Sequence, residues 1–205
     1  MIYESCPWKR DLLRRRSIII KNNTNEEYSK DCDKVYTSVE KGVFYSAFII
    51  RKLIDSKGKL SEEAERYTFQ VGEIKPLKQV DSFHRYPDID THDWEKEKIR
   101  TVQGKEICNW LIHSYIFCMV GLEKPFSFFY VSSDYDRNKS LYKISMEDWL
   151  DYMKFIATDY VVAINSHYDE EKKDYVYTKK ERLRYTEQIT RGEKEKGKGK
   201  IGVRD

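Results

Sequence analysis

Two long stretches of the chain space their apolar residues as a buried helix does. From Lys34 to Ser56, apolar side chains recur three and four positions apart, and the run Val43 to Ile50 is apolar on nearly every side. From Thr101 to Val120, positions 108, 111, 112, 115, 116, 119 and 120 are apolar, and Gly121 follows. Both patterns predict helices, and the second predicts the most central helix of the molecule.

Two further helices are predicted near the ends of this pattern. Ser5 and Pro7 open a stretch with helical spacing, because proline is tolerated in the first turn of a helix. Ser145 begins a loose capping box, and the apolar residues after it predict a helix as far as Asn165. The polar residues 21–33 between the first two helices predict a loop.

Short alternating segments predict a small amount of strand. Phe126 to Ser133 and Leu141 to Ile144 flank a polar turn, which predicts an antiparallel β-hairpin near 126–144. Gly72 and Pro76 reduce residues 67–77 to a weak edge strand, and residues 174–178 predict a last strand. The predicted fold is mainly α: a helical bundle with a small antiparallel β-hairpin addition, forming one domain over residues 1–178.

Composition and charge refine this picture. The chain has 205 residues and is 40% hydrophobic, enough for a sizeable core, and it has no apolar run of the 18 or so residues that cross a bilayer. Residues 179–205 hold 10 Lys and Arg against 5 Asp and Glu, whereas residues 1–178 hold 28 against 30. We therefore expect no membrane association and a basic, charged tail after the domain.

The four cysteines predict a reducing compartment. No C-x-x-C pair occurs among Cys6, Cys32, Cys108 and Cys118. On one predicted helix, Cys108 and Cys118 would lie about 15 Å apart, which is too far for a disulfide. Free thiols and a cytoplasmic location are the simplest expectation. Isolated glycines exclude a P-loop and a dinucleotide fingerprint, and we expect no small-molecule cofactor.

A polar pair interrupts the predicted central helix. Asn109 and His113 are four residues apart and therefore share one side of a helix. An imidazole titrates near neutral pH, so His113 could act as a general acid or base with Asn109 as its orienter. The alternative is a packed histidine whose ring is simply hydrogen-bonded.

These residues resemble the HEPN family. Residues 41–59 (KGVFYSAFIIRKLIDSKGK) are similar in texture to its second helix, and residues 109–115 (NWLIHSY) resemble its motif segment, in which Arg-Asn precedes an apolar pair and a His. The resemblance implies a helical bundle that dimerises, and either a metal-independent ribonuclease or an inactive relative in a toxin–antitoxin or phage-defence system. The family's arginine is absent, since positions 106–108 hold Glu, Ile and Cys.

Two other clusters are candidate sites. Arg14, Arg15 and Arg16 could contact the phosphates of a nucleic acid, although the pattern favours a solvated helix face over a nucleic-acid site. The predicted loop over residues 79–98 carries imidazoles and carboxylates that could bind a divalent metal, but their spacing matches no zinc or calcium loop. The candidate metal ligands in this loop are His84, Asp88, Asp90 and His92.

Three functions follow from these candidates. The first is a HEPN-like protein that binds or cleaves RNA, as a homodimer, with His113 and Asn109 as the catalytic pair. The second is a non-enzymatic immunity or inhibitor protein that binds a protein partner. The third is a metal-dependent phosphoesterase built on the loop 79–98. The missing arginine favours the second function, and the histidine keeps the first open.

Overall fold

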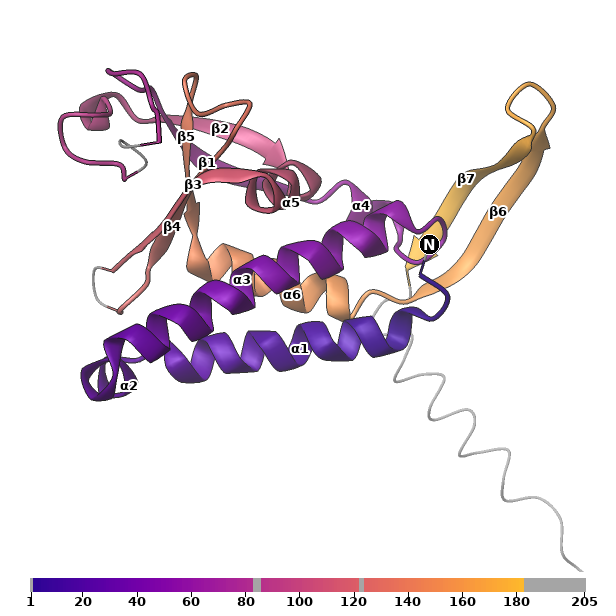
Figure 1. Cartoon of the computed structure of the whole chain (residues 1–205). Coiled ribbons are helices and arrows are strands. Elements are labelled where there is room, and N and C mark those ends of the chain that lie inside the picture. Colours follow the sequence, from indigo (N-terminus) through magenta and orange to yellow (C-terminus); the bar gives the residue numbers. More distant parts are fainter. Residues whose placement is uncertain (1, 83–85, 122–123, 183–205) are drawn as a thin grey trace, which may run out of the picture.

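The computed structural model describes residues 2–82, 86–121 and 124–182. In this part of the chain, a five-stranded antiparallel sheet has the order β2-β1-β5-β4-β3, and a separate two-stranded hairpin pairs β6 with β7 (Figure 1). The helices are α1 (Ser5–Asn22), α2 (Asn25–Lys30), α3 (Cys32–Asp55), α4 (Glu62–Glu65), α5 (Gly104–Ile112) and α6 (Met146–Ala157). The strands are β1 (Thr68–Ile74), β2 (Lys98–Gln103), β3 (Ser114–Val120), β4 (Phe128–Ser133), β5 (Leu141–Ser145), β6 (Val161–Asp169) and β7 (Asp174–Arg182).

The fold is mixed α and β, so the expectation of a mainly α helical bundle is wrong. The helices α1 and α3 and the β4–β5 hairpin lie where the sequence predicts them. The hairpin, however, is the middle of a five-stranded sheet rather than a small addition, because β1 pairs with β5 and β3 pairs with β4. The predicted loop over residues 21–33 contains α2.

The largest error concerns residues 101–120, which form no single helix. Residues 98–103 are β2, α5 is short, and the chain turns at His113 into β3. The run from Tyr115 to Val120 is apolar at every position, and such a run satisfies a period of 3.6 and a period of 2 equally well. Its aromatic and β-branched residues favour the strand, which becomes the edge of the sheet next to β4.

Two smaller errors have similar causes. The helix that begins at Ser145 ends at Ala157, and the β-branched residues after it form β6 instead of continuing to Asn165. Residues 68–74 form an interior strand rather than an edge, paired with β2 on one side and β5 on the other. Gly72 suits this position because the Glu97 side chain occupies the space where a Cβ would lie. Pro76 follows the end of the strand and does not interrupt it.

The helices pack against one face of the sheet and form the main core. Trp149 of α6 is fully buried against Phe69 and Phe129 of the sheet, and its indole N–H donates to Ser46 of α3 at 3.0 Å. The helices α1 and α3 approach closely at Gly42, where a Cβ would lie 2.6 Å from Ile19. This core fixes the sheet against the helices.

The opposite face of the sheet has a second, smaller core. Ile74, Ile116 and Leu141 are buried there together with Val80 from the segment that connects β1 and β2. Trp94 of the same segment packs on this cluster. The predicted loop over residues 79–98 therefore serves as a cover for the sheet in the residues that the structure describes.

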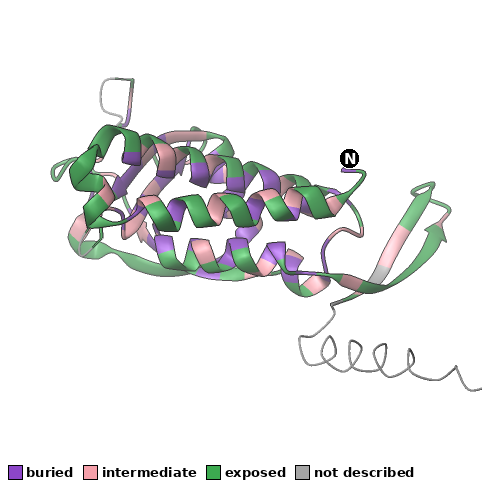
Figure 2. Cartoon of the chain, turned by 90° about the horizontal axis from the view of Figure 1, so that it is seen from below, coloured by how far each residue is buried: buried purple, intermediate pink, exposed green. Residues whose placement is uncertain are grey.

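The β6–β7 hairpin projects from the end of the molecule where α1 begins, and we call it the arm (Figure 1). Figure 2 shows it almost entirely exposed, whereas the helices carry buried stripes. A buried joint lies at its base: the Lys9 ammonium donates to the backbone carbonyls of Lys59 and Asp159. The Asp159 carboxylate in turn accepts from the Ser61 amide at 2.8 Å and hydroxyl at 2.7 Å. The expected basic tail, 179–205, begins within β7, and residues 183–205 lie outside the described part.

Candidate functional site

The short helix α5 positions the predicted catalytic pair. A capping box between Gln103 and Glu106 begins the helix, and His113 is its C-cap, with its amide bonded to the Asn109 carbonyl at 3.0 Å. His113 is exposed to solvent and Asn109 is half-buried. The histidine is therefore at the surface at a helix end, and not in the centre of a bundle.

Asn109 and His113 line one open pocket, which we call the His113 pocket. Its volume is about 390 Å³, within the range of small-molecule sites. The turn between β4 and β5 forms the opposite wall, and the Asp134 amide of this turn donates to the His113 carbonyl at 3.1 Å. The lining residues are Asn109, Trp110, His113, Ser133, Asp134, Tyr135 and Asp136.

An arginine from another helix lies next to the predicted pair. Arg51 of α3 donates its Nε–H to the Asn109 side-chain oxygen at 2.8 Å and forms an ion pair with Asp55. The bond fixes the amide so that its oxygen faces the guanidinium. Arg51 could not be found from the sequence, because it lies 58 positions from Asn109 and no spacing on α5 reveals it.

A flat aromatic stack joins the pocket to the sheet, because Trp110 of the pocket lining stacks on Tyr142 of β5. The rings of Trp110 and Tyr142 lie 3.7 Å apart and 3° from parallel. Arg100 of β2 donates to the Tyr142 hydroxyl at 3.3 Å. Burial raises the pKa of Tyr142, so its hydroxyl is protonated at neutral pH. The stack ties α5 to the sheet and keeps the pocket wall rigid.

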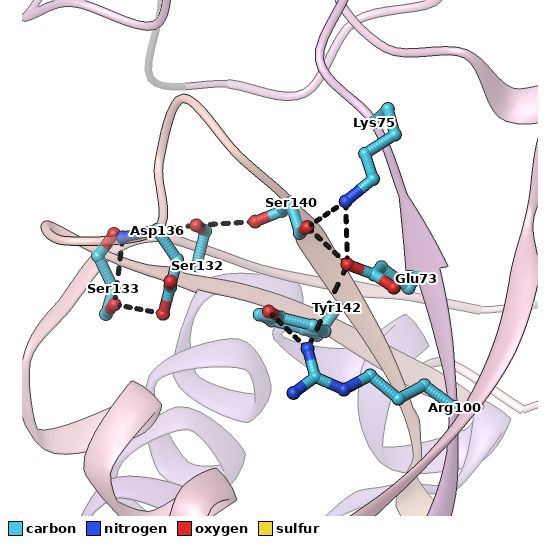
Figure 3. A network of polar contacts seen from close by, with 8 residues as sticks. All are labelled: Glu73, Lys75, Arg100, Ser132, Ser133, Asp136, Ser140 and Tyr142. Atoms are coloured by element: carbon cyan, nitrogen blue, oxygen red, sulfur yellow. Dashed lines mark hydrogen bonds and ion pairs between the residues drawn. The ribbon is translucent and has the colours of Figure 1, made fainter.

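Serine hydroxyls hold the turn on the other side of the pocket (Figure 3). Ser133 donates to the Asp136 carboxylate at 2.8 Å, and Ser132 donates to the Ser140 carbonyl at 2.8 Å. The Ser140 hydroxyl donates to Glu73 at 2.5 Å. Figure 3 shows these bonds as one network that runs from the turn to strand β1. The turn is thus fixed from both ends.

The same network sets the charge of Glu73. The Lys75 ammonium bonds to this carboxylate at 2.8 Å, and together with the Ser140 hydroxyl it lowers the pKa of Glu73. Arg100 adds a weaker contact at 4.0 Å. Glu73 is therefore ionised at neutral pH and paired with cations, which marks it as a structural carboxylate and not as a general acid.

Aromatic rings and cations line the outer rim of the pocket. Tyr135 is 80% exposed, and the Lys139 ammonium lies over its ring at 3.1 Å. Arg137 lies over Tyr115 at 4.4 Å and pairs with Asp134 at 3.3 Å. Asp134 is thus neutralised, and the rim presents the exposed Tyr135 ring beside cationic groups.

The three predicted phosphate ligands do not converge. Arg15 forms an ion pair with Asp11 at 3.1 Å, and Arg16 donates to the Leu150 carbonyl at 2.8 Å. Both are half-buried against neighbouring helices, whereas Arg14 is exposed. They lie on α1 and do not line the His113 pocket. Arg16 therefore joins α1 to α6, and the Arg15 guanidinium lies over the Tyr45 ring of α3 at 4.3 Å.

The predicted metal ligands are also spread apart. His92 is buried, and its Nδ1 lies 2.9 Å from the Thr91 hydroxyl. Asp90 is exposed and pairs with Lys78, and Asp88 is exposed as well. His84 lies outside the described residues. Within the described part of the chain, no three His, Cys, Asp or Glu residues are close enough to hold a metal ion.

The cysteines are free where the structure places them. Cys108 is in α5 and Cys118 is in β3, so they do not share a helix as expected, and both are buried. Burial raises the pKa of Cys118 to about 11 and raises the pKa of Cys108 further. Both thiols are protonated at neutral pH and are poor nucleophiles.

No helix in the described residues is long and apolar enough to cross a membrane. Comparison of the chain with protein-family models, with curated proteins and with solved structures returned no match.

Proposed function

We propose that the protein binds single-stranded RNA at the His113 pocket. The observation that carries the proposal is the chemistry of the pocket wall, which sets the exposed Tyr135 ring beside the Asn109 amide and the His113 imidazole. A splayed-out nucleobase has the matching chemistry: a flat face that stacks on aromatic rings and an edge of hydrogen-bond donors and acceptors. The pocket volume of about 390 Å³ admits one base.

The charges around the pocket fit a base better than a bare phosphate. Asp134 is paired with Arg137, and Asp136 accepts from Ser133, so both carboxylates have partners. Carboxylates can also accept from the amino groups of bases. The backbone of the RNA would then pass along the rim, where Arg137 and Lys139 supply positive charge. We place this activity in the cytoplasm, as the four free cysteines favour.

Cleavage of the bound RNA extends the same proposal. His113 would accept the 2′-hydroxyl proton while the 2′ oxygen attacks the neighbouring phosphorus. The bond from phosphorus to the 5′ oxygen breaks, and the leaving oxygen takes a proton from water. Asn109, held by Arg51, would orient the substrate next to the imidazole. This reaction needs no metal ion, in keeping with a HEPN-like role in a bacterial or phage conflict system.

Binding is tested with Tyr135→Ala and a short fluorescent single-stranded RNA. Base stacking on an aromatic ring contributes about 1–3 kcal/mol, so the variant should bind about 5- to 150-fold more weakly. Tyr3→Ala is the matched control, because Tyr3 is 90% exposed and remote from the pocket, and it should bind as the wild type does. Equal anisotropy titrations for both variants, or no binding by the wild type, would refute the proposal.

Cleavage is tested in EDTA with His113→Gln, which keeps a hydrogen-bonding side chain at an exposed position. Loss of an acid–base group reduces the rate by about 100-fold or more. RNA binding should persist in this variant, which separates a chemical role from a positioning role. If the wild type binds RNA but leaves it intact over the same period, the protein is a binding module and not a ribonuclease.

A further inference from the structure

The outer side of α3 carries a stripe of aromatic rings and cations that the His113 pocket does not use. Lys41, Tyr45, Phe48 and Lys52 follow one another at spacings of four, three and four, so they share one side of the helix. All four are exposed, Tyr45 at 50% and Phe48 at 45%. At a rise of about 1.5 Å per residue, the stripe is about 16 Å long.

The neighbouring helix α1 widens this stripe. The Arg15 guanidinium lies over the Tyr45 ring at 4.3 Å, and the Trp8 ring lies 6.4 Å from the Phe48 ring. The Lys52 ammonium lies over the Phe48 ring at 5.6 Å. These contacts hold cations beside rings on a rigid pair of helices. We call this surface the α1–α3 face, and it consists of Arg14, Arg15, Lys41, Tyr45, Phe48 and Lys52.

The charge of the α1–α3 face is positive and largely unpaired. Arg15 forms an ion pair with Asp11 at 3.1 Å. Among the residues that the structure describes, Arg14, Lys41 and Lys52 have no carboxylate partner, and all three are exposed. Residues 1–178 as a whole hold 28 Lys and Arg against 30 Asp and Glu. The positive charge is therefore local to this face and does not follow from a basic chain.

The α1–α3 face adjoins the His113 pocket. The helix α3 lies between α1 and α5 (Figure 1). Arg51 precedes Lys52 on α3, and its Nε–H donates to the Asn109 side-chain oxygen at the pocket wall at 2.8 Å. A ligand that leaves the pocket over Arg51 therefore reaches the cations and rings of the face directly.

A strand of nucleic acid has the chemistry that matches this surface. Its phosphates carry one negative charge per nucleotide, and proteins that bind single strands combine cations for the backbone with aromatic rings for the bases. A membrane surface fits less well, because helices that lie on a bilayer present a wide apolar side to it. The apolar side of α3, with Val39, Val43 and Ile50, is fully buried in the core.

We propose that the α1–α3 face binds the backbone of the same RNA strand whose base occupies the His113 pocket. The phosphates lie against the three unpaired cations, and the bases beyond the pocket lie against the two exposed rings. This inference rests on the RNA binding proposed above and defines its substrate: a single strand long enough to reach from the pocket across α3 to α1.

The first test removes two of the cations. Each phosphate contact contributes about 0.7 to the slope of log Kd against log salt concentration for a single strand. Lys41→Gln/Lys52→Gln should therefore lower that slope by about 1.4 and weaken binding of a single-stranded RNA by about 25-fold at about 0.1 M salt. Lys98→Gln/Lys154→Gln is the matched control, because it removes two exposed lysines from β2 and α6. The control should keep the affinity and the slope of the wild type.

Two further measurements separate length from stacking. The titrations use fluorescent RNAs of about 16 and about 4 nucleotides. The shorter RNA should bind the wild type more weakly, and the difference between the wild type and Lys41→Gln/Lys52→Gln should narrow. Phe48→Leu keeps an apolar side chain but removes a ring, so it should weaken binding of the longer RNA at least about fivefold with an unchanged salt slope. Circular dichroism confirms that each variant is folded.

The outcomes distinguish this inference from the proposed function. If Tyr135→Ala weakens RNA binding but Lys41→Gln/Lys52→Gln binds as its control does, the RNA leaves the pocket in another direction and the inference is wrong. If only the lysine variant binds more weakly, the face is an RNA site and the pocket is not. No RNA binding by the wild type removes both proposals.

Vesicles test the other anionic partner. If the wild type binds vesicles of phosphatidylserine and phosphatidylcholine, and Lys41→Gln/Lys52→Gln loses that binding while its RNA affinity is unchanged, the face is a membrane surface. That result would overturn the inference as well.

Discussion

The five-stranded sheet and the arm are built from similar residues but in different surroundings. Phe129, Val131 and Ile144 in the sheet are completely buried, because helices cover one face and the segment before β2 covers the other. Val162 and Ile164 in the arm are each almost half exposed. The two regions use similar strand-forming residues, and they differ in how much apolar surface their neighbours cover, on which the free energy of unfolding depends.

We call the helices and the five-stranded sheet together the body. Among the mutations considered, we expect the largest loss of stability for one in the main core of the body. Trp149→Ala removes a fully buried ring and its bond to Ser46, and it should lower the free energy of unfolding by about 3–5 kcal/mol. Urea titration followed by circular dichroism measures this loss. A loss below about 1 kcal/mol would mean that the core does not carry the stability of the molecule.

The joint between the body and the arm should give the next effect. Lys9→Met leaves the buried carbonyls of Lys59 and Asp159 without their shared donor, so we expect a loss of about 1–3 kcal/mol. Lys21→Met is the control, because Lys21 lies on the same helix and is exposed. If both variants unfold at the same urea concentration, the joint contributes nothing to stability.

Acid should weaken the cover over the sheet more modestly. Burial lowers the pKa of His92 below its ordinary 6.5, so the folded protein keeps this ring neutral while the unfolded chain takes up a proton. Stability from this group is complete above about pH 6.5 and is lost as the pH falls from there through the lowered pKa of the folded ring. Urea titrations at pH 7, 6 and 5 should show a shallower decline for His92→Gln. Parallel declines would contradict this account.

The smallest effect is expected within the arm. In a monomeric sample, Tyr168→Ala should change the free energy of unfolding by less than about 0.5 kcal/mol. The Tyr168 ring is almost half exposed, and its ring contact within the described part of the arm is with Tyr175. A measurement at low protein concentration isolates this value. A loss as large as that of Trp149→Ala would show that the arm belongs to the same folding unit as the core.

Local sequence predicted the elements whose pattern has one interpretation. The helix α3 and the strands β4 and β5 have clear periods and lie where expected. Residues 101–120 were predicted wrongly as one helix, because the unbroken apolar run over residues 115–120 fits a helical and a strand period equally. In addition, β1, β2 and β3 acquire their partners from distant parts of the chain. Burial by other elements, and not local preference, decides such segments.

The candidate site likewise has residues that the sequence predicts and residues that only tertiary packing reveals. The spacing of Asn109 and His113 predicts that they share one side of the molecule, and both line one pocket. Arg51 and the turn around Tyr135 reach that pocket through tertiary packing, so no motif contains them. The expected arginine on α5 is missing, and its neighbour in space comes from α3 instead.

The bond between Lys9 and Asp159 joins residues that are 150 positions apart. During synthesis at about 5–20 residues per second, α1 leaves the ribosome many seconds before α6, its partner. The nascent chain can pair α1 with α3 early, but one flank of that helical hairpin remains uncovered until α6 emerges. Chaperones that recognise exposed apolar helices should therefore engage this protein during its translation, and release it only when the last part of the body has been made.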